Sequence, residues 1–258
     1  MADKPTRVTF LGTGTSSGIP VIACNCPVCK SSNPHDKRYR SSVMVEIAGQ
    51  RFVIDCGPDF RIQMLSNHVD DIDAILFTHE HRDHIAGIDD IRPFNYTLNK
   101  VIDVYGTLRV MDSIRTEFPY IFSENSYVGA PKLNINITDG QPFMIGSTEI
   151  YPIEVKHNKL MIYGYRIGDF TYITDASSIS PVSIEKIRGT KVLVINALRI
   201  SKQAAHFSLS EALGIIEQLK PERAYLTHIS HYLGLHDEVE AKLPNNVRLA
   251  YDNLVIEL

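Results

Sequence analysis

Short apolar runs recur along both halves of the chain, some alternating with polar residues and some continuous, and this pattern predicts β-strands rather than long helices. Gly49-Gln50 and Gly168-Asp169 each separate two such runs, and both pairs are typical of hairpin turns. The expected strands are 8–11, 43–47, 52–55, 74–77, 101–105, 149–155, 162–167, 171–174, 192–195, 224–227 and 255–258.

Helical spacing of apolar residues appears at 60–66, 110–118, 181–187 and most clearly at 208–219. Ser208 is followed three residues later by Glu211, the spacing of a capping box, and Leu213, Ile216 and Leu219 form one apolar stripe. The sequence contains no low-complexity tract, no flexible linker and no solenoid repeat. We therefore expect a single domain, 1–258, of α/β class, in which two sheets are covered by helices on their outer faces.

The bulk composition is that of a water-soluble globular domain, with 44% hydrophobic and 22% charged residues. The net charge of −4 argues against broad nucleic-acid binding, and the basic residues Lys37, Arg38 and Arg40 are interpreted as solvated surface. No apolar run approaches the roughly 20 residues of a membrane span, and the N-terminus lacks an apolar signal core. A cytoplasmic protein without membrane contact is expected, and a homodimer is left open.

The segment 78–84 carries the densest chemistry in the chain, Thr-His-Glu-His-Arg-Asp-His, directly after the apolar run 74–77. It offers four ligands within six positions, His79, His81, Asp83 and His84. Imidazole nitrogen and carboxylate oxygen suit zinc, manganese or iron. One tetrahedral site cannot use all four groups with sensible geometry, whereas two neighbouring metals can. Paired metals are a standard device for hydrolysing phosphate esters.

Isolated ligands follow later strands, as a two-metal site requires. His157 follows the run ending at Val155, Asp175 follows Thr174, and His228 follows Thr227. Each is expected where a buried strand emerges into a loop, a usual position for a ligand on a rigid scaffold.

In this order of ligands the chain resembles the metallo-β-lactamase superfamily of hydrolases, and the resemblance spans nearly the whole chain. It implies a four-layer αββα sandwich of metallo-β-lactamase type. It also implies one metal held by His79, His81 and His157, and another held by Asp83, His84 and His228. Asp175 would bridge both metals together with a hydroxide. Asp55, in Ile54-Asp55-Cys56-Gly57, would orient the ligands by hydrogen bonding.

Three cysteines within six positions, Cys24, Cys26 and Cys29, indicate a metal site in a reducing compartment more readily than disulfides. Together with the preceding segment 11–20, they resemble the phosphoribosyl cyclic phosphate phosphodiesterases of phosphonate utilisation. That resemblance implies a structural zinc completed by His231, with His35 and His236 as rival fourth ligands. A Cys3His set is a closed tetrahedral site. The glycines of 12–18 have the wrong spacing for a dinucleotide loop and predict a tight loop bordering the metals.

His206, just before the capped helix, is the remaining catalytic candidate; in related phosphodiesterases a histidine here assists the leaving oxygen. The leading hypothesis is a dinuclear metal-dependent phosphodiesterase, using manganese or zinc with iron as a third alternative. It would hydrolyse a small, cyclic phosphodiester by attack of the bridging hydroxide, with Asp175 and His206 as catalytic residues.

Other functions on the same fold stay open at this point. The alternatives are an endonuclease similar to tRNA 3′-end-processing enzymes, and a hydrolase of esters, thioesters or lactones. A scaffold without catalysis is a further reading, although no ligand position is missing. The sequence has no basic, glycine-rich insertion, and this absence weakens the nuclease hypothesis. The aromatic-rich segment 92–127 is compatible with a lid, a dimer surface or plain core packing, and no site residue is assigned there.

Overall fold

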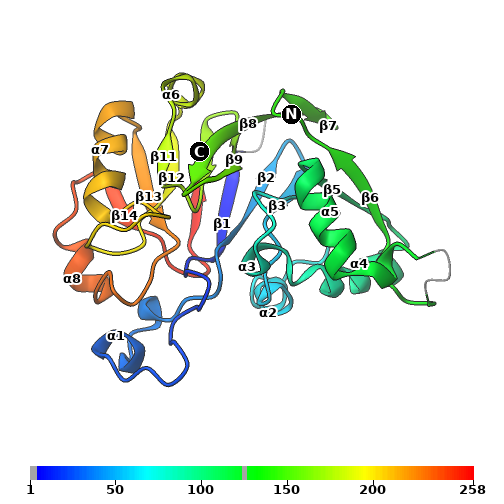
Figure 1. The fold of residues 1–258 in the computed structure, drawn as a ribbon, viewed down its shortest axis with the longest axis horizontal. Helices are drawn as coiled ribbons and strands as arrows, with labels where there is room; N and C mark the ends of the chain where they lie inside the picture. Colours follow the sequence, from blue (N-terminus) through cyan, green and yellow to red (C-terminus); the bar gives the residue numbers. More distant parts are fainter. Residues whose placement is uncertain (1–4, 124–126) are drawn as a thin grey trace.

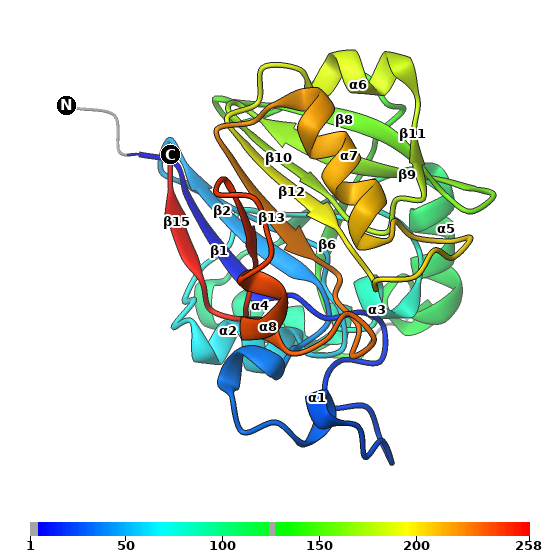
Figure 2. The same cartoon turned by 90° about the vertical axis from the view of Figure 1, so that its left-hand side faces the viewer.

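Two mixed sheets with helices on their outer faces make up the fold (Figures 1 and 2), as seen in a computed structural model that describes residues 5–123 and 127–258. In Figure 1, α6 and α7 lie on the left and α2 to α5 lie on the right. Most of the strands lie between them, and β6 lies to the right of α5. The α/β class and the four-layer αββα arrangement predicted from the sequence are confirmed.

The first sheet has the strand order β15-β1-β2-β3-β4-β5-β6. The second has the order β11-β8-β9-β10-β12-β13-β14, with β7 paired to β8. The strands of the first sheet are β1 Arg7–Gly12, β2 Ser42–Ile47, β3 Gln50–Ile54, β4 Ala74–Leu76, β5 Ile102–Gly106, β6 Leu133–Ile137 and β15 Val255–Glu257. Those of the second are β7 Phe143–Ile145, β8 Thr148–His157, β9 Leu160–Ile167, β10 Phe170–Ile173, β11 Ser178–Ile179, β12 Val192–Asn196, β13 Arg223–Thr227 and β14 Val247–Leu249.

The helices are mostly short. They are α1 Pro27–Lys30, α2 Phe60–Ser66, α3 Arg82–Ile85, α4 Arg92–Leu98, α5 Leu108–Glu117, α6 Pro181–Ile187, α7 Leu209–Leu219 and α8 His236–Glu240, with 3-10 turns at Pro34–Asp36, Ile88–Ile91 and Pro119–Ile121. The capping box predicted for α7 is confirmed, because the Ser208 side chain accepts from the Glu211 backbone and Glu211 accepts in return. Within the described ranges, no helix has the length and apolar character needed to cross a membrane.

Three apolar cores hold the layers together. The central one lies between the two sheets and includes Phe10, Phe52, Tyr165 and Phe170, each with no exposed surface. A second joins α6 and α7 to the outer face of the second sheet, and a third joins α2 to α5 to the first sheet. Because the strands are covered on both faces, their sequences are nearly continuous apolar runs.

The aromatic-rich segment divides between the core and the surface. Phe94 is buried in the third core, and Phe118 and Phe122 pack against it, whereas Tyr96 is exposed. Residues 124–126 of this segment lie outside the described residues. Core packing therefore accounts for part of its aromatic content.

Candidate metal centre and active site

Three strand ends turn sharply into the candidate site through left-handed backbone at non-glycine residues. Asp55 follows β3 with φ +66°, Asp175 follows β10 with φ +57°, and His228 follows β13 with φ +53°. This conformation is uncommon for such residues and costs free energy, and strain of this kind clusters at functional sites. The first of these residues comes from one sheet and the other two from the second sheet.

Three histidines form the first potential metal-binding group. Ligand atoms of His79, His81 and His157 all lie within 4.8 Å of one another. The Nε2 atom of His79 is 3.0 Å from Nδ1 of His81. His157 is the last residue of β8 rather than a loop residue beyond it, so this ligand extends from the strand itself.

The second potential group combines carboxylates and imidazoles: Asp83, His84, Asp175 and His228. The Nε2 atom of His84 is 3.2 Å from an Asp83 oxygen and 3.3 Å from Oδ2 of Asp175. The other Asp175 oxygen, Oδ1, is 3.1 Å from Nε2 of His228. Asp175 therefore lies between His84 and His228, and it also belongs to a third grouping with His157 and His206.

Asp55 lies behind this cluster, fully buried, and organises it through Thr78. One Asp55 oxygen accepts the backbone N–H of Thr78 at 2.8 Å, and the other accepts Nδ1–H of His84 at 2.7 Å. The Thr78 hydroxyl donates to Asp55, so its oxygen is left to accept Nδ1–H of His79 at 2.9 Å. Both histidines thus turn a bare Nε2 toward the site, the arrangement typical of metal-ligating imidazoles.

A similar arrangement, with a threonine hydroxyl between an aspartate and a histidine, occurs at the end of a strand in the second sheet. The Thr174 hydroxyl donates to Asp175 at 2.6 Å, and its oxygen lies 3.4 Å from Nδ1 of His228. His157 donates Nδ1–H to the backbone oxygen of Ala205 at 2.7 Å. Sequence reasoning missed these threonines. The available signal was that Thr78, Thr174 and Thr227 each directly precede a ligand candidate at a strand end.

Burial keeps several of these imidazoles neutral. It lowers the pKa of His79 and His157 below the usual value and that of His228 to about 4. Burial opposes ionisation of Asp175, but His228 and His84 outweigh it and hold the pKa of its carboxyl well below the usual range. Neutral His79, His157 and His228 beside an ionised carboxylate have the protonation states that ligate divalent cations. At His84 burial is outweighed by the carboxylates of Asp83, Asp55 and Asp175, which raise the pKa well above its usual value.

The surroundings of one buried nitrogen, Nε2 of His84, indicate that a cation fits the site. Nε2 of His84 has no hydrogen-bond partner, although two carboxylate oxygens lie close to it. Neither oxygen has hydrogen-bonding geometry, so a proton on this nitrogen would be left unshared in a buried position. A cation placed between the nitrogen and the two oxygens would satisfy all three. The donor set, imidazole with carboxylate, suits zinc, manganese and iron.

Glycines let the backbone of α3 pack closely against the turn after β3. A Cβ on Gly57 would lie 2.1 Å from the backbone oxygen of Asp83, and a Cβ on Gly87 would lie 2.1 Å from the oxygen of Gly57. This contact fixes Asp83 and His84 relative to Asp55. Nearby, the Thr15 hydroxyl is 3.2 Å from Nε2 of His228, so the glycine-rich loop borders the candidate site as predicted.

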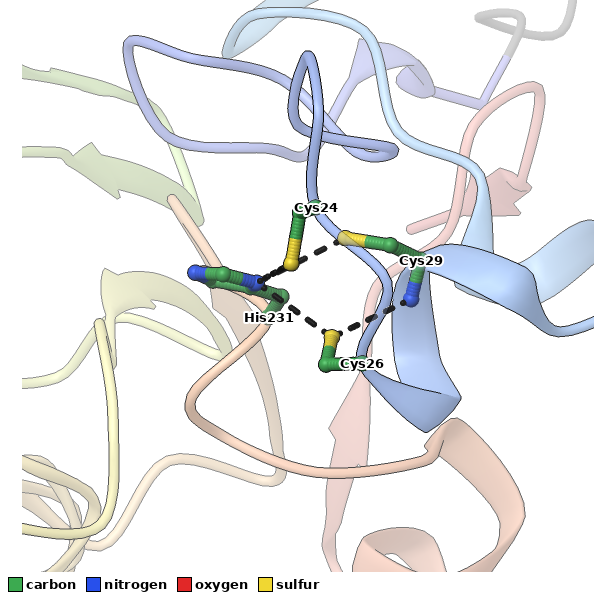
Figure 3. A group of neighbouring side chains, drawn as sticks. All are labelled: Cys24, Cys26, Cys29 and His231. Carbon is green, nitrogen blue, oxygen red and sulfur yellow. Dashed lines mark hydrogen bonds between the residues drawn. The ribbon is translucent and has the colours of Figure 1, made fainter.

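The three clustered cysteines surround one nitrogen of His231 (Figure 3). The sulfurs of Cys24, Cys26 and Cys29 lie 3.3, 3.4 and 3.5 Å from its Nδ1. Zinc bonds of about 2.3 Å to sulfur and about 2.0 Å to nitrogen at tetrahedral angles put S and N roughly 3.5 Å apart. The geometry fits that ion.

The rival fourth ligands lie elsewhere. His35 and His236 group with Asp237. Arg38 donates to Nδ1 of His236 at 3.1 Å and is buried, so its interpretation as solvated surface is wrong. A ring whose Nδ1 accepts from arginine carries its proton on Nε2 when neutral, so neither nitrogen of His236 is free for a metal. Among the three histidines considered from the sequence, the structure brings His231 to the cysteines.

With this geometry in place, comparison with known proteins identifies the family. Residues 50–229 match the model of the beta-lactamase superfamily domain. The chain belongs to this superfamily. Its structure has the metallo-β-lactamase fold, as the sequence predicted.

Two similar proteins cover nearly the whole chain. The crystal structure of a diphosphatase from the PhnP family matches with a TM-score of 0.93 and 38% identity, covering 99% of this chain and 98% of that one. An octanoyltransferase of Porphyromonas gingivalis is 38% identical over 96% of this chain and 51% of its own length. A ribonuclease Z of Clostridium kluyveri is 39% identical over 23% of this chain and 20% of its own length. The chain thus spans about half the length of the octanoyltransferase and about a fifth of the length of the ribonuclease Z.

Proposed function

We propose that this chain is a dinuclear metal-dependent phosphodiesterase that hydrolyses a small phosphodiester, with a cyclic one as the favoured class. The observation that carries the proposal is the position of Asp175, whose oxygens lie between His84 and His228 at 3.3 and 3.1 Å while the three-histidine group lies alongside. A carboxylate shared in this way supports two adjacent cations rather than one.

The proposed ligands follow the two groups. His79, His81 and His157 would hold one metal, Asp83, His84 and His228 would hold the other, and Asp175 would bridge them. When bound, the metals would neutralise phosphate oxygens and make the attacking water acidic. The donor set supports manganese or zinc, with iron as the third alternative.

The protein's own contribution is orientation. Asp55 and Thr78 hold the rings of His84 and His79 so that each presents a bare nitrogen. An open surface depression of about 400 Å³, lined by His81, His157 and Lys159 among others, lies beside the three-histidine group and offers room for a small substrate. His206 lies with Nε2 at 2.9 Å from Oδ1 of Asp175, and this N–H would be shared with the leaving oxygen of a bound substrate.

The small-substrate class rests on two observations. The net charge of −4 does not favour a polyanionic nucleic acid. The PhnP-family protein that matches over the full length is a diphosphatase, so a diphosphate diester is the second substrate class to test.

A second, structural metal site is part of the proposal. Cys24, Cys26, Cys29 and His231 would hold a zinc ion. Because His231 lies three residues beyond the proposed ligand His228, this zinc would fix the cysteine-containing loop close to the active site.

The experiment is a substrate panel on protein reconstituted separately with manganese and with zinc. It compares a ribose cyclic phosphate, a cyclic nucleotide, a diphosphate diester, a lactone, an octanoyl thioester and precursor tRNA. We expect turnover of the cyclic phosphodiesters, and its loss by at least about 10³-fold in Asp175→Ala, because that change removes the shared carboxylate. Exposed Asp112→Ala on α5 is the matched control.

Three outcomes would contradict the proposal. Wild-type turnover by Asp175→Ala with metal present would exclude the dinuclear mechanism. Preferential thioester or lactone cleavage would move the function to acyl chemistry. Cleavage of precursor tRNA with tight, salt-dependent binding would favour the nuclease alternative.

A further inference from the structure

The side chain of Gln203 lies against the ring of His206 on the side away from the proposed metals. The amide Nε2 of Gln203 is 2.6 Å from Nδ1 of His206. The opposite ring nitrogen, Nε2 of His206, is 2.9 Å from Oδ1 of Asp175. Both nitrogens of the ring are therefore engaged, one by an amide and one by a carboxylate.

The orientation of the amide is set by a second contact. The backbone N–H of Ala205 donates to Oε1 of Gln203 at 3.2 Å. This contact occupies the amide oxygen and turns the NH2 group toward His206. An amide NH2 is only a donor, so Nδ1 of His206 must present a lone pair to it.

The contact of the opposite ring nitrogen, Nε2, assigns the proton independently. An ionised carboxylate is only an acceptor, so the nitrogen that faces Asp175 must carry a proton. A neutral imidazole has one protonated and one bare nitrogen, and the two contacts assign the proton to Nε2. Amide and carboxylate thus agree on a single tautomer.

We propose that Gln203 fixes His206 as the neutral Nε2–H tautomer, so that His206 acts as a hydrogen-bond donor to a substrate oxygen and not as a metal ligand. Gln203 is then a positioning residue. The catalytic consequence rests on the proposed phosphodiesterase function, whereas the tautomer itself does not.

This assignment separates His206 from the other histidines of the cluster. His157 donates Nδ1–H to the oxygen of Ala205 at 2.7 Å and keeps its Nε2 bare, which suits a ligand. His206 has the opposite proton position, although its ring lies 4.6 Å from that of His157. The segment 203–206 therefore orients two neighbouring imidazoles for different roles. A doubly protonated His206 would direct its Nδ1–H at the amide NH2. Both groups are hydrogen-bond donors, so this contact would be unfavourable.

The direct test is the ring-nitrogen NMR spectrum of zinc-loaded protein labelled with 15N-histidine, zinc being diamagnetic. The His206 signals are assigned by their loss in His206→Ala. We expect a protonated Nε2 and an unprotonated Nδ1 in the wild type. In Gln203→Glu the carboxylate still accepts from Ala205 but also demands a proton on Nδ1, so Nδ1 should become protonated. Gln218→Glu, the same change at an exposed position of α7, should leave the His206 signals unchanged.

A kinetic test uses Gln203→Met, which keeps the side-chain length and removes the amide. With a series of aryl methyl phosphates, we expect kcat to fall about tenfold for the most basic leaving group and less for nitrophenol, with KM within about twofold. His206→Ala should lose about 10²-fold in the same graded way, as expected for removal of one donor to developing charge. The His157 signals report whether the 203–206 segment has kept its structure.

A protonated Nδ1 in the wild type, or an unchanged tautomer in Gln203→Glu, would overturn the proposal. Equal loss for all leaving groups in Gln203→Met would overturn its catalytic consequence. If the wild type cleaves none of the phosphodiesters, the proposed function fails, while the NMR result still decides the role of Gln203.

Discussion

At the scale of the residue, the ligand candidates could be predicted because each has metal-binding chemistry and a place at a strand end. The structure brings His79, His81, Asp83, His84, His157, Asp175 and His228 into adjoining groups, and their binding of metal stays a prediction. The supporting contacts could not be predicted in the same way. These contacts are made by Thr78, Ala205 and Gln203 through hydrogen bonds whose geometry depends on the folded backbone.

Asp55 offers a residue-scale test of the ligand orientation. In Asp55→Asn one oxygen becomes an NH2 group, which then faces a donor from either Thr78 or His84. We expect the affinity for the active-site metals to fall about 10- to 100-fold, as when the hydrogen-bond partner of a metal ligand is removed. Competition with a chromophoric chelator measures it. The exposed Asp112→Asn should bind metal normally, and equal affinities for the two variants would contradict this role.

His236 permits a prediction on pH and stability away from the site. Burial, aided by Arg38, lowers the pKa of His236 to about 4. The unfolded chain then takes up this proton near pH 6.5, before the folded protein does, so the stabilisation is complete above pH 6.5 and is lost toward pH 4. His236→Asn keeps the acceptor for Arg38 but does not titrate.

We expect the free energy of unfolding of the wild type to fall between pH 6.5 and 4 by about 1–2 kcal/mol more than that of His236→Asn, allowing for solvent screening. Urea denaturation across this range gives both slopes. Parallel slopes would mean that His236 titrates alike in the folded and unfolded chain.

At the scale of the element, strong apolar periodicity predicted most of the buried strands and the helices α2, α5, α6 and α7 within a few residues. The missed elements are those with little buried surface. β6 buries none of its residues fully at the edge of the first sheet, β14 has three residues, and α4 buries only Phe94 and Asn95. A short or half-exposed element has no clear apolar pattern, because pairing with neighbours rather than burial stabilises it.

The contact of α3 with the turn after β3 yields a prediction at this scale. In Gly57→Ala the new Cβ would meet the backbone oxygen of Asp83, so α3 must move away from Asp55. We expect a loss of about 1–3 kcal/mol in stability and a larger loss in metal affinity, because Asp83 and His84 shift together. Gly214→Ala in α7 meets no atom within 4 Å and should be neutral or stabilising by up to about 1 kcal/mol. Thermal denaturation and metal titration distinguish the two variants, and a Gly57→Ala protein with wild-type metal affinity would contradict the proposed coupling.

At the scale of the whole molecule, the two sheets contribute different ligands to one site. His79 to His84 belong to the first sheet's connections, and His157, Asp175 and His228 belong to the second. The order of the strands in the chain is visible in the sequence, but their order in the sheets is not, because parallel neighbours such as β12 and β13 are joined through helices.

Metals bound there would hold the two sheets together. Ligand binding at about 100-fold excess over Kd adds roughly 2.7 kcal/mol to the free energy of unfolding. We expect chelation to lower Tm by about 5 °C or more for a chain of this size. Calorimetry on the zinc-loaded and chelated proteins measures the difference. In His84→Ala the chelator-induced shift should shrink, and an unchanged shift would assign the effect to another site.

The cysteine group has a consequence for the order in which the molecule folds. Cys24 and His231 are 207 positions apart, so a zinc ion bound by both would close a loop of most of the chain. The entropy of closing such a loop must be offset before the last bond forms, and a contact of this separation belongs to the late stage of folding. During synthesis the three thiols emerge 202 to 207 residues before the histidine. Completion of this zinc site would therefore mark the moment at which the cysteine segment meets the loop after β13.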